Sequence, residues 1–501
     1  MKLGQLLKGI PDHDLSGDPE QEIQGLGYDS RQVRAGHLFV ALKGSTQNGH
    51  NYLRDAIQNG AVALVAEEFK ELQGVVASVK VPDSRDALSK LAVQFYDHPN
   101  KGINLIGITG TNGKTTTSYL LESIIAQTGA RPGVIGTISY RFHGKTHTAS
   151  VTTPESLDLM RLLREMADGG VTDVILEVSS HALDQKRTSG CPFRVAIFTN
   201  FSRDHLDYHD TMEEYFQAKS LLFRGLKKGE PYDDSSAIIN TDDPKGKELV
   251  ALTEADVITY GLGRESDVRA DSISAGKDGL RARLITPVGE KDIRSSLIGK
   301  INIYNILAAS AAALSLNIDL NTVAEGIERL TVVPGRLELV PNSRGLTVVV
   351  DYAHTPDALL KTLKTLSPLV KGRLITVFGC GGDRDKGKRY DMGLVAGENS
   401  EFVFITSDNP RSEDPESIIA QIEKGTLKSG LTRKEWTTEP QSVGPAYFIE
   451  EDRRKAIQKA IATATEKDLV LIAGKGHEDY QIYSGEKRYF DDRKEAALAA
   501  N

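Results

Sequence analysis

Cysteine is scarce in this chain of 501 residues, which contains only Cys191 and Cys380. The two lie far apart without a paired spacing, so the sequence predicts neither a disulfide framework nor a zinc site. Long apolar runs are also missing, since no segment approaches the roughly 20 uncharged apolar residues that span a bilayer. The N-terminal stretch meets acidic residues too early for a secretory signal and lacks the Arg and Ser of a transit peptide. We therefore expect a cytoplasmic protein without a membrane span.

Neither sign of charge is concentrated in one part of the sequence. Lys and Arg number 61 against 69 Asp and Glu, which gives a net charge of −8 without a basic block. This balance argues against a nucleic-acid surface, although a few local cations could still hold a small anionic ligand. Aromatic residues make up only 6%, but 39% of residues are hydrophobic, enough for several cores. The length indicates about three domains, and we expect a monomer.

Two stretches of different pattern come first. Residues 1–95 predict a small mixed unit, with strands at His37–Leu42 and Ala61–Glu67 around a helix at Asn51–Gln58. Tyr96–Gly102 has the polar, Pro- and Gly-containing composition of a linker. Residues 96–333 then alternate apolar runs with helical patterns, which is typical of a parallel sheet covered on both faces. The predicted strands are Asn104–Ile108, Asp173–Val178, Val195–Asn200 and Ala237–Asn240.

A second break near Val332–Arg336 separates residues 334–501, where the alternation restarts. The predicted strands are Leu346–Asp351, Leu374–Gly379, Phe402–Ser407 and Leu469–Gly474. Each ends in a polar or glycine-rich patch, and ligands of open α/β sheets bind at the carboxyl ends of strands, so the four endings predict one concave site. The glycine spacing after Leu374–Gly379 does not fit dinucleotide binding. The predicted fold class is α/β with three domains: a small mixed N-terminal domain, a central P-loop parallel-sheet ATPase domain and a Rossmann-like C-terminal domain.

The segment Gly107–Thr117 has the context of a phosphate-binding loop, because it follows a strand and precedes a helix. Backbone N–H groups and the helix N-terminus would hold phosphate, Lys114 would neutralise the β and γ phosphates, and Thr115 would offer a hydroxyl to Mg²⁺. The usual glycine six residues before the lysine is replaced by Ile108. The alternative is a glycine-rich turn without a ligand. The expected ATP-binding residues of the loop are Gly110, Thr111, Asn112, Gly113, Lys114, Thr115 and Thr116.

Two further candidates follow predicted strands. Glu177 closes one strand, and His205 lies just past the next. A carboxylate and an imidazole together permit two metal ions between the phosphates and a second substrate. Taken alone, His205 is more readily explained as a hydrogen-bonded loop histidine than as a ligand.

The predicted helix Thr211–Phe223 carries an unusual lysine. Its apolar positions follow the i, i+3, i+4 pattern, and Lys219 falls on the same inward face. A buried lysine is costly unless it is paired, and desolvation lowers its pKa. One explanation of Lys219 is a side chain that reaches the surface or pairs with an acid. The other is a neutral amine that reacts with CO₂ to form a carbamate, an anion able to bind metal.

Together these motifs resemble those of the Mur ligases of bacterial cell-wall synthesis, nearly from end to end. The central segments are Gly110–Thr115, Glu177–Leu183 and Asn200–His209, with Lys219 downstream. Asp29–Gly44 looks like the family's uridine-nucleotide-binding start. Segments similar to the tripeptide-forming members are Thr152–Ser156, Ile301–Ala309, Pro334–Glu338, Asp351–Asp357 and Gly379–Arg389. The family shares the unusual glycine spacing of the loop.

The resemblance implies ATP-dependent amide ligation with Mg²⁺. The D-Glu γ-carboxylate of UDP-N-acetylmuramoyl-L-Ala-D-Glu would attack ATP to give an acyl phosphate and ADP, and an incoming amine would displace phosphate. Positioning and charge neutralisation would dominate. The implied catalytic residues are Lys114, Glu177, His205 and Lys219. The implied metal ligands are Thr115, Glu177, His205 and Lys219 as its carbamate (N6-carboxylysine).

Matching motifs imply the remaining contacts. ATP would also be held by Asn305, Arg336, Asp351 and His354. The UDP-linked dipeptide would be held by Ser30, Thr152, Thr153, Ser179, Gln185 and Arg187. The serines and threonines of this set could individually be ordinary cap or turn residues.

The segment Asp408–Arg411, DNPR, bears on the amino acid that is added. The far end of meso-diaminopimelate carries an ammonium and a carboxylate, whereas lysine carries only the amine. A guanidinium pairs bidentately with a carboxylate, and DNPR resembles the diaminopimelate-adding form. The alternative for Arg411 is a surface ion pair with Glu413 or Asp414. The implied diaminopimelate contacts are Arg389, Asp408, Asn409, Pro410, Arg411, Gly474 and Glu478.

Three rival functions remain open at this point. The first is a lysine-adding ligase of the same family. The second is a folylpolyglutamate synthetase, against which the uridine-binding start of the chain argues. The third is a non-catalytic paralogue that serves as a scaffold, which would have no use for an inward lysine.

Overall fold

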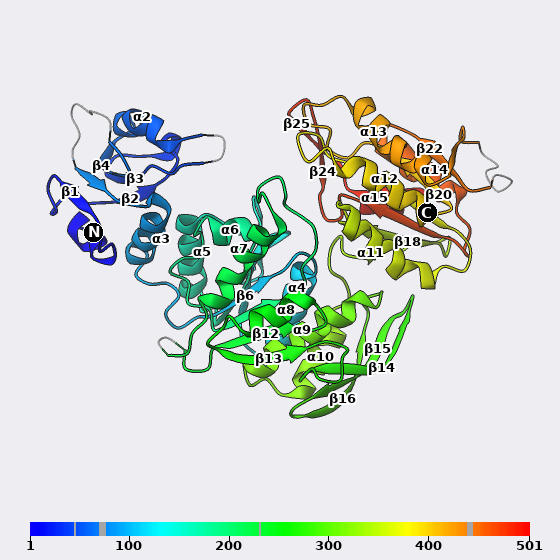
Figure 1. Cartoon of the computed structure of the whole chain (residues 1–501), viewed down its shortest axis with the longest axis horizontal. Helices are drawn as coiled ribbons and strands as arrows, with labels where there is room; N and C mark the ends of the chain where they lie inside the picture. Colours follow the sequence, from blue (N-terminus) through cyan, green and yellow to red (C-terminus); the bar gives the residue numbers. More distant parts are fainter. Residues whose placement is uncertain (45–46, 70–76, 230–231, 438–443) are drawn as a thin grey trace.

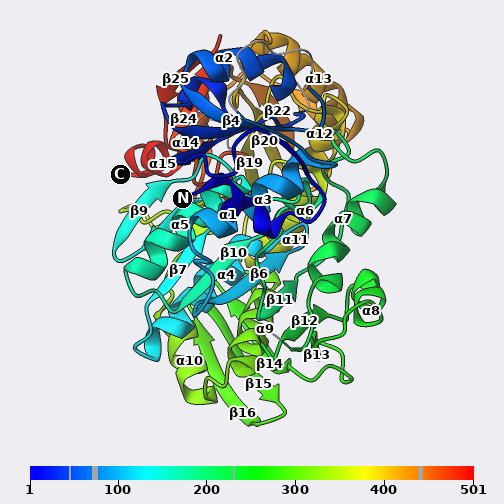
Figure 2. The ribbon, with the colours of Figure 1, turned by 90° about the vertical axis from the view of Figure 1, so that its left-hand side faces the viewer.

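The computed structural model describes residues 1–44, 47–69, 77–229, 232–437 and 444–501. Three main sheets follow one another along the chain (Figure 1). The N-terminal sheet and the C-terminal sheet lie at opposite ends of the long axis, and the central sheet lies between and below them. The view along that axis likewise places both outer units above the central sheet (Figure 2). None of the described helices is long and apolar enough to cross a membrane.

The N-terminal sheet has five short strands in the order β1-β5-β4-β3-β2. They are β1 (Asp14–Ser16), β2 (Gly25–Gly27), β3 (His37–Val40), β4 (Ala61–Ala66) and β5 (Ser78–Lys80). Only β1 and β5 pair antiparallel. The accompanying α-helices are α1 (Leu3–Leu6), α2 (Leu53–Gln58) and α3 (Ser84–Phe95). The two strands and the helix predicted here are confirmed, although the predicted helix begins as a 3₁₀ turn, Gly49–Tyr52.

The central sheet has the order β13-β12-β11-β6-β10-β7-β8-β9. Its strands are β6 (Asn104–Thr109), β7 (Pro132–Ile135), β8 (Ser139–Phe142), β9 (Lys145–Thr148), β10 (Asp173–Glu177), β11 (Val195–Phe198), β12 (Ser236–Asn240) and β13 (Asp256–Tyr260). The prediction of an all-parallel sheet is corrected, because β8 and β9 add an antiparallel edge. All four residues of β9 are exposed, so the sequence has no apolar run there from which this edge strand could be predicted.

Helices cover the central sheet and connect its strands. They are α4 (Lys114–Gln127), α5 (Ser156–Asp168), α6 (Ser180–Asp184), α7 (Met212–Arg224), α8 (Pro244–Val250), α9 (Ile301–Ser315) and α10 (Leu320–Arg329). Since β11, β6 and β10 are adjacent and parallel, the loops that follow them meet at one edge. The order of strands therefore brings the phosphate loop, Glu177 and the loop of His205 together.

A separate three-stranded antiparallel sheet packs under the central unit, and the sequence reasoning did not predict it. Its strands are β14 (Arg269–Gly276), β15 (Gly279–Thr286) and β16 (Gly289–Ser295). Leu280, Leu284 and Ile293 from this sheet enter the same core as the alanine-rich helix α9. The opposite face is charged and exposed, so the strands lack the continuous apolar runs of a parallel sheet.

The C-terminal sheet has the order β17-β18-β23-β19-β20-β22-β21, parallel except for β17 against β18. Its strands are β17 (Glu338–Leu339), β18 (Thr347–Asp351), β19 (Leu374–Phe378), β20 (Phe402–Ile405), β21 (Thr432–Arg433), β22 (Ala446–Ile449) and β23 (Leu469–Ala473). A hairpin, β24 (Tyr480–Tyr483) with β25 (Glu486–Tyr489), stands apart from it. The helices are α11 (Pro356–Leu366), α12 (Lys388–Glu398), α13 (Pro415–Lys428), α14 (Arg453–Thr463) and α15 (Asp492–Ala500).

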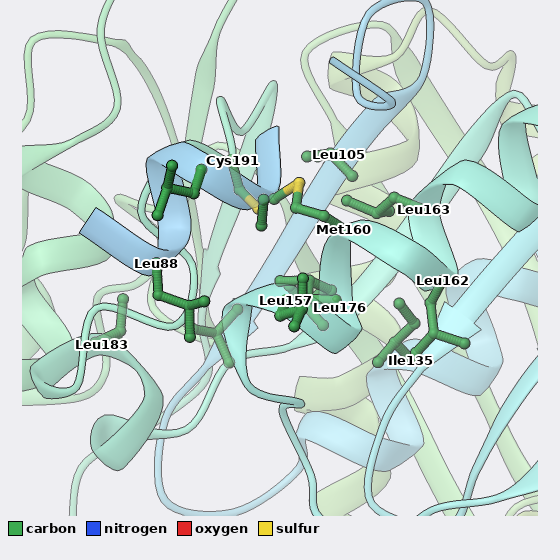
Figure 3. Close-up of a cluster of buried hydrophobic side chains, with 14 of the residues drawn as sticks. Leu88, Leu105, Ile135, Leu157, Met160, Leu162, Leu163, Leu176, Leu183 and Cys191 are labelled. Atoms are coloured by element: carbon green, nitrogen blue, oxygen red, sulfur yellow. The ribbon is translucent and has the colours of Figure 1, made fainter. Parts of the chain in front are cut away.

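One hydrophobic core connects the N-terminal unit to the central sheet. Leu88 of α3 packs beside Leu157 and Met160 of α5, with Cys191 in the same cluster (Figure 3). Burial raises the pKa of the Cys191 thiol to about 12, so the group stays protonated. The predicted division after residue 95 therefore falls directly after a helix that shares a core with the next unit, and both predicted domain boundaries stay predictions.

Candidate active site

Two glycines shape the phosphate loop. Their backbone has a positive φ, a conformation that other residues adopt only with strain. Gly110 has φ of 137° and Gly113 has φ of 88°. A Cβ on Gly110 would lie 1.9 Å from Thr199 Oγ1, and one on Gly113 would lie 2.4 Å from Asn305 Oδ1. The loop ends at Lys114, the first residue of α4, so the helix N-terminus faces the loop opening. This arrangement suits a phosphate group.

Two lysines converge on this loop. Lys114 Nζ donates to the carbonyl oxygens of Gly110 and Thr111 at 2.8 and 2.9 Å. Lys219 Nζ donates to the same Gly110 oxygen at 3.0 Å and is only 1% exposed. The prediction that Lys219 points inward is confirmed, and its side chain does not reach the surface. Burial, reinforced by the neighbouring Lys114, lowers the pKa of Lys219 well below its usual value; burial also lowers the pKa of Lys114.

Glu177 lies beside the loop. Hydroxyl and backbone N–H donors hold its carboxylate in place. Thr115 Oγ1 donates to Oε2 at 3.0 Å, and Thr137 Oγ1 donates to the same oxygen at 2.8 Å. The backbone N–H of Thr137 donates to Oε1 at 3.2 Å. Thr137 follows β7 and was missed from the sequence, because a single threonine after a strand carries no distinguishing signal.

His205 lies on the loop after β11 in the left-handed region, with φ of 56°. The Asp204 carboxylate accepts the backbone N–H of His205 at 2.8 Å and lies 3.6 Å from its ring Nε2. Burial lowers the pKa of His205 to about 4, although Asp204 opposes the shift. A neutral imidazole is the form that binds metal. Asp204 was missed because the sequence reasoning singled out only the histidine.

The residues predicted to hold metal supply part of the ligand set that a hard cation needs. The Thr115 hydroxyl and the Glu177 carboxylate supply oxygen donors of the kind Mg²⁺ prefers, and Mg²⁺ commonly completes its shell with phosphate and water. Within the described ranges no group of three or more His, Cys, Asp or Glu side chains is spaced to hold a metal ion alone. The donor set therefore fits a metal bound together with phosphate or a carbamate rather than a closed protein site.

The C-terminal unit contributes directly to this site. Arg336 Nη2 donates to Thr115 Oγ1 at 3.3 Å, and the Arg336 guanidinium lies 4.6 Å from the centre of the Tyr352 ring. Asp351 accepts the backbone N–H groups of Leu337 and Ala353 at 2.8 and 2.9 Å. Burial raises the pKa of Asp351. Tyr352 lies in the segment Asp351–Asp357, from which only Asp351 and His354 were predicted as site residues.

These groups line a cavity of about 820 Å³ between the central and C-terminal units. Every residue predicted to bind ATP lines it, with the exception of Gly110, and so do all the predicted metal ligands. From the set predicted for the UDP-linked substrate, Thr152, Thr153, Ser179 and Arg187 line the same cavity. The cavity therefore brings the predicted nucleotide, metal and acid groups together.

The other predicted substrate residues lie outside that cavity. Gln185 Oε1 accepts a hydrogen bond from Arg187 Nη2 at 2.7 Å, which places Gln185 behind the wall. Arg187 in turn donates to the carbonyl of Thr153 at 3.0 Å. Ser30 belongs to the N-terminal unit, where it is buried and its carbonyl accepts from Asn59.

The residues predicted for diaminopimelate form a second group, at the ends of β20 and β23 and, for Arg389, on α12. Asn409 Nδ2 donates to Glu478 Oε2 at 2.9 Å, and a Cβ on Gly474 would lie 2.7 Å from Asp408 Oδ2. None of these residues lines the 820 Å³ cavity. The prediction that four strand endings form one concave site stays a prediction: the ending of β18 and Arg384 after β19 line the nucleotide cavity, and the endings of β20 and β23 lie beside it, where the backbone N–H of Gly474 donates to the Asp351 carbonyl at 3.1 Å.

The two arginines of this second group, Arg411 and Arg389, differ in their hydrogen-bond partners. Arg411 Nη1 donates to the carbonyl of Gly382 at 2.7 Å, and within the described residues no carboxylate lies within 4.0 Å of its guanidinium. The surface ion pair with Glu413 or Asp414 is thus not formed. Glu413 instead pairs bidentately with the fully buried Arg389, at 2.9 and 3.0 Å. The Nε of Arg389 has no hydrogen-bond partner among the described residues.

Known proteins are similar to this chain over its full length. Residues 22–96 match the family model described as Mur ligase family, catalytic domain; residues 108–313 match the Mur ligase middle domain, and residues 335–476 match the Mur ligase glutamate ligase domain. A protein from Geobacter metallireducens is 47% identical over 506 aligned residues, which cover 100% of this chain and 98% of that protein. The chain belongs to the Mur ligase family.

Other relatives of this Mur ligase carry the same name as the Geobacter protein, UDP-N-acetylmuramoyl-L-alanyl-D-glutamate--2,6-diaminopimelate ligase. One from Geobacillus kaustophilus is 44% identical and covers 100% of this chain and 99% of its own length. A solved structure of that name is 33% identical with a TM-score of 0.69, over 100% of this chain and 99% of the other. A folylpolyglutamate synthase from Mycobacterium tuberculosis, complexed with ADP, shares only the fold, at 19% identity, a TM-score of 0.63 and 78% of this chain.

Proposed function

We propose that this Mur ligase adds meso-2,6-diaminopimelate to the D-Glu γ-carboxylate of UDP-N-acetylmuramoyl-L-Ala-D-Glu, with conversion of ATP to ADP and phosphate. The names of the full-length relatives support this reaction. The observation that carries the chemistry is the convergence of Lys114 and Lys219 on the phosphate loop beside Glu177. The positive charge of Lys114 at this point allows a triphosphate and a carboxylate to approach each other.

The first step is phosphoryl transfer to the acid. The γ-carboxylate oxygen forms a bond to the γ-phosphorus, the bond from that phosphorus to the bridging oxygen breaks, and ADP leaves. Lys114 and the N-terminus of α4 neutralise the charge that develops on the phosphate oxygens. Arg187 and Ser179 lie on the cavity wall where the acid would enter. Their role is to orient the carboxylate for in-line attack.

The second step forms the amide. The uncharged amine of the incoming amino acid attacks the acyl carbon, the tetrahedral intermediate collapses, and inorganic phosphate leaves with the electron pair of the broken C–O bond. The amine nitrogen then loses a proton to solvent or phosphate. The protein supplies placement and charge stabilisation rather than a covalent intermediate.

Thr115 and Glu177 would hold Mg²⁺, with His205 and a carbamate on Lys219 as further ligands. When bound, the ion neutralises phosphate charge. The depressed pKa of Lys219 favours the free amine that CO₂ requires, and the carbamate formed from it would be an anion able to bind the metal. Because the reaction consumes ATP, we place it in the cytoplasm, and we expect the monomer to be the active form.

The order of domains supports the same assignment. We propose that residues 1–95 hold the UDP group through Ser30, residues 96–333 hold ATP and the acid, and residues 334–501 bring the amino acid. We expect closure of the C-terminal unit to bring the amino acid to the acyl phosphate for amide formation. Movements of this kind commonly limit turnover.

A lysine-adding ligase is the alternative, and one observation argues against it. The Arg411 guanidinium has only carbonyl partners among the described residues, so it is available to a ligand carboxylate, which lysine lacks at its far end. The experiment is phosphate release by the purified protein with ATP, Mg²⁺ and the UDP-linked dipeptide, with meso-diaminopimelate or L-lysine as the acceptor. Release that requires the dipeptide and diaminopimelate supports the proposal. Equal release without the dipeptide, or a preference for lysine, contradicts it.

A further inference from the structure

The cluster predicted to bind the amino acid contains a buried cation that has no part in the chemistry above. Lys475 follows β23, between Gly474 and Gly476, and is 0% exposed. Its Nζ donates to Glu478 Oε2 at 3.0 Å and to Asn409 Oδ1 at 3.2 Å, and it lies 5.3 Å from the centre of the Tyr480 ring.

The hydrogen bonds of this group are arranged around one oxygen of Glu478. Lys475 and Asn409 both donate to Oε2, and Asn409 Oδ1 also accepts the backbone N–H of Ile482 at 3.1 Å. No donor from the described residues reaches Oε1 of Glu478. Lys475 thus fixes the carboxylate and leaves its second oxygen for an outside donor, such as the ammonium of a ligand.

The charges of the cluster balance because of Lys475. Asp408 and Glu478 are negative, and Arg411 and Lys475 are positive, so the net charge is zero. Nearby, Arg453 pairs with Asp492, and Glu413 pairs with the buried Arg389 and, at 3.4 Å, with the exposed Lys386. Without the Lys475 charge the cluster would carry one net negative charge.

The net charge matters for the choice of acceptor. The far end of meso-diaminopimelate is a zwitterion with no net charge, whereas the side chain of lysine carries one positive charge. A neutral site with separated charges complements the zwitterion, and a site with a net negative charge favours the lone cation. Rejection of a competitor through net charge is a form of specificity that acts without contact between Lys475 and the ligand.

We propose that Lys475 is a specificity-determining residue that acts through Glu478. Its ammonium cancels the Glu478 charge and orients the carboxylate, so that a zwitterionic side chain is accepted and a purely cationic one is disfavoured. This inference rests on the proposed function, since it concerns the acceptor of that reaction. Because Lys475 is enclosed, it is a positioning residue and not one that touches substrate.

The test compares kcat/KM for meso-diaminopimelate and for L-lysine, from phosphate release at saturating ATP and UDP-linked dipeptide. In Lys475→Gln and Lys475→Met we expect the diaminopimelate-over-lysine ratio to fall by about tenfold or more, while Lys475→Arg keeps most of it. Glu478→Gln leaves the Lys475 charge uncancelled, so the ratio should rise even though both rates fall. These opposite shifts are the signature of a charge effect.

The control is Arg373→Gln, which removes a cation from another ion pair of the same unit, with Asp468 at 2.8 Å. It should lower thermal stability without changing the ratio. Parallel losses of both acceptors in Lys475→Gln and in Glu478→Gln would overturn the inference and leave Lys475 a structural residue. Should the Lys475 variants not fold, Glu478→Gln alone decides by whether the ratio rises. A wild-type protein that fails to use diaminopimelate at all refutes the proposed function instead.

Discussion

Lys114 and Lys219 donate hydrogen bonds to the same oxygen, the Gly110 carbonyl, at 2.8 and 3.0 Å. Neither ammonium forms an ion pair with a carboxylate among the residues that the structure describes. Burial, and repulsion between two ammonium groups this close together, lower the pKa of Lys219 well below its usual value and favour its neutral amine. The arrangement becomes favourable once an anion enters, either a phosphate of ATP or a carbamate on Lys219. The two lysines therefore prepare the site for negative charge.

The first prediction concerns Lys219. Lys219→Ala should lower kcat by on the order of 100-fold, because it removes both the amine and any carbamate formed on it. Acetate or propionate at millimolar concentration should restore part of the activity by placing a carboxylate in the vacated space. Phosphate release measured with and without these acids checks this. Lys228→Ala, at a lysine paired with Asp256 on the surface, should respond to neither change, and an unrescued Lys219→Ala would argue against the carbamate.

Glu177 gives a second prediction. Glu177→Gln keeps the size of the side chain but removes the negative charge that Thr115 and Thr137 surround. We expect kcat to fall by about 100-fold and the Mg²⁺ concentration for half-maximal rate to rise, because the metal loses a charged ligand. A Mg²⁺ titration of phosphate release measures both. An unchanged Mg²⁺ requirement would show that Glu177 does not hold the metal.

The third prediction concerns the guanidinium of Arg411. Arg411→Ala should raise the KM for meso-diaminopimelate by about 30-fold or more, since it strands the ligand carboxylate without a partner. The KM for ATP should stay the same, because Arg411 does not line the nucleotide cavity. Steady-state kinetics with each substrate varied in turn provide the measurement. Arg433→Ala, at a partly exposed arginine near Glu423, serves as the matched control, and a normal diaminopimelate KM in Arg411→Ala refutes the assignment.

The fourth prediction concerns stability in acid. Burial of the Asp468 carboxyl opposes its ionisation, but hydrogen bonds from Arg373 outweigh this and lower its pKa to about 2. A pKa lowered in the folded state gives stability that is fully present above the unfolded value, about 4, and is lost as pH falls through 2. The loss should be on the order of 1 kcal/mol. Thermal unfolding of wild type and Asp468→Asn between pH 5 and pH 2 checks this: the variant should start less stable, and the difference should shrink with acid. A constant difference would contradict the prediction.

The sequence predicted the buried parallel strands well. Strands β6, β10, β18 and β23 begin and end within one or two residues of their predicted bounds, because each is a short apolar run between polar residues. The antiparallel sheet β14–β16 and the edge strand β9 escaped prediction, since their alternating or wholly exposed residues do not form such runs. Tertiary packing against α9 stabilises β14–β16, and that contact is not visible in local sequence.

The candidate site shows the same division. The loop, Lys219, Glu177 and Arg336 were found because motif or periodicity marks them, and the structure brings them to one cavity. Thr137 and Asp204 were missed because their roles depend on which strands are neighbours. Lys475 lies between two predicted residues, Gly474 and Glu478, yet its contacts with Asn409 and Glu478 depend on how β20 and β23 are arranged. Their chemical roles remain predictions that the experiments above address.

The packing of α3 on α5 has a practical consequence for anyone who divides the chain. Leu88 packs in one cluster with Leu157 and Met160 of α5 (Figure 3), so a fragment that starts after residue 95 would expose these two side chains to water. Apolar patches of that kind promote association of copies. A shortened protein without its first helices should therefore aggregate during purification, although it would retain the phosphate loop.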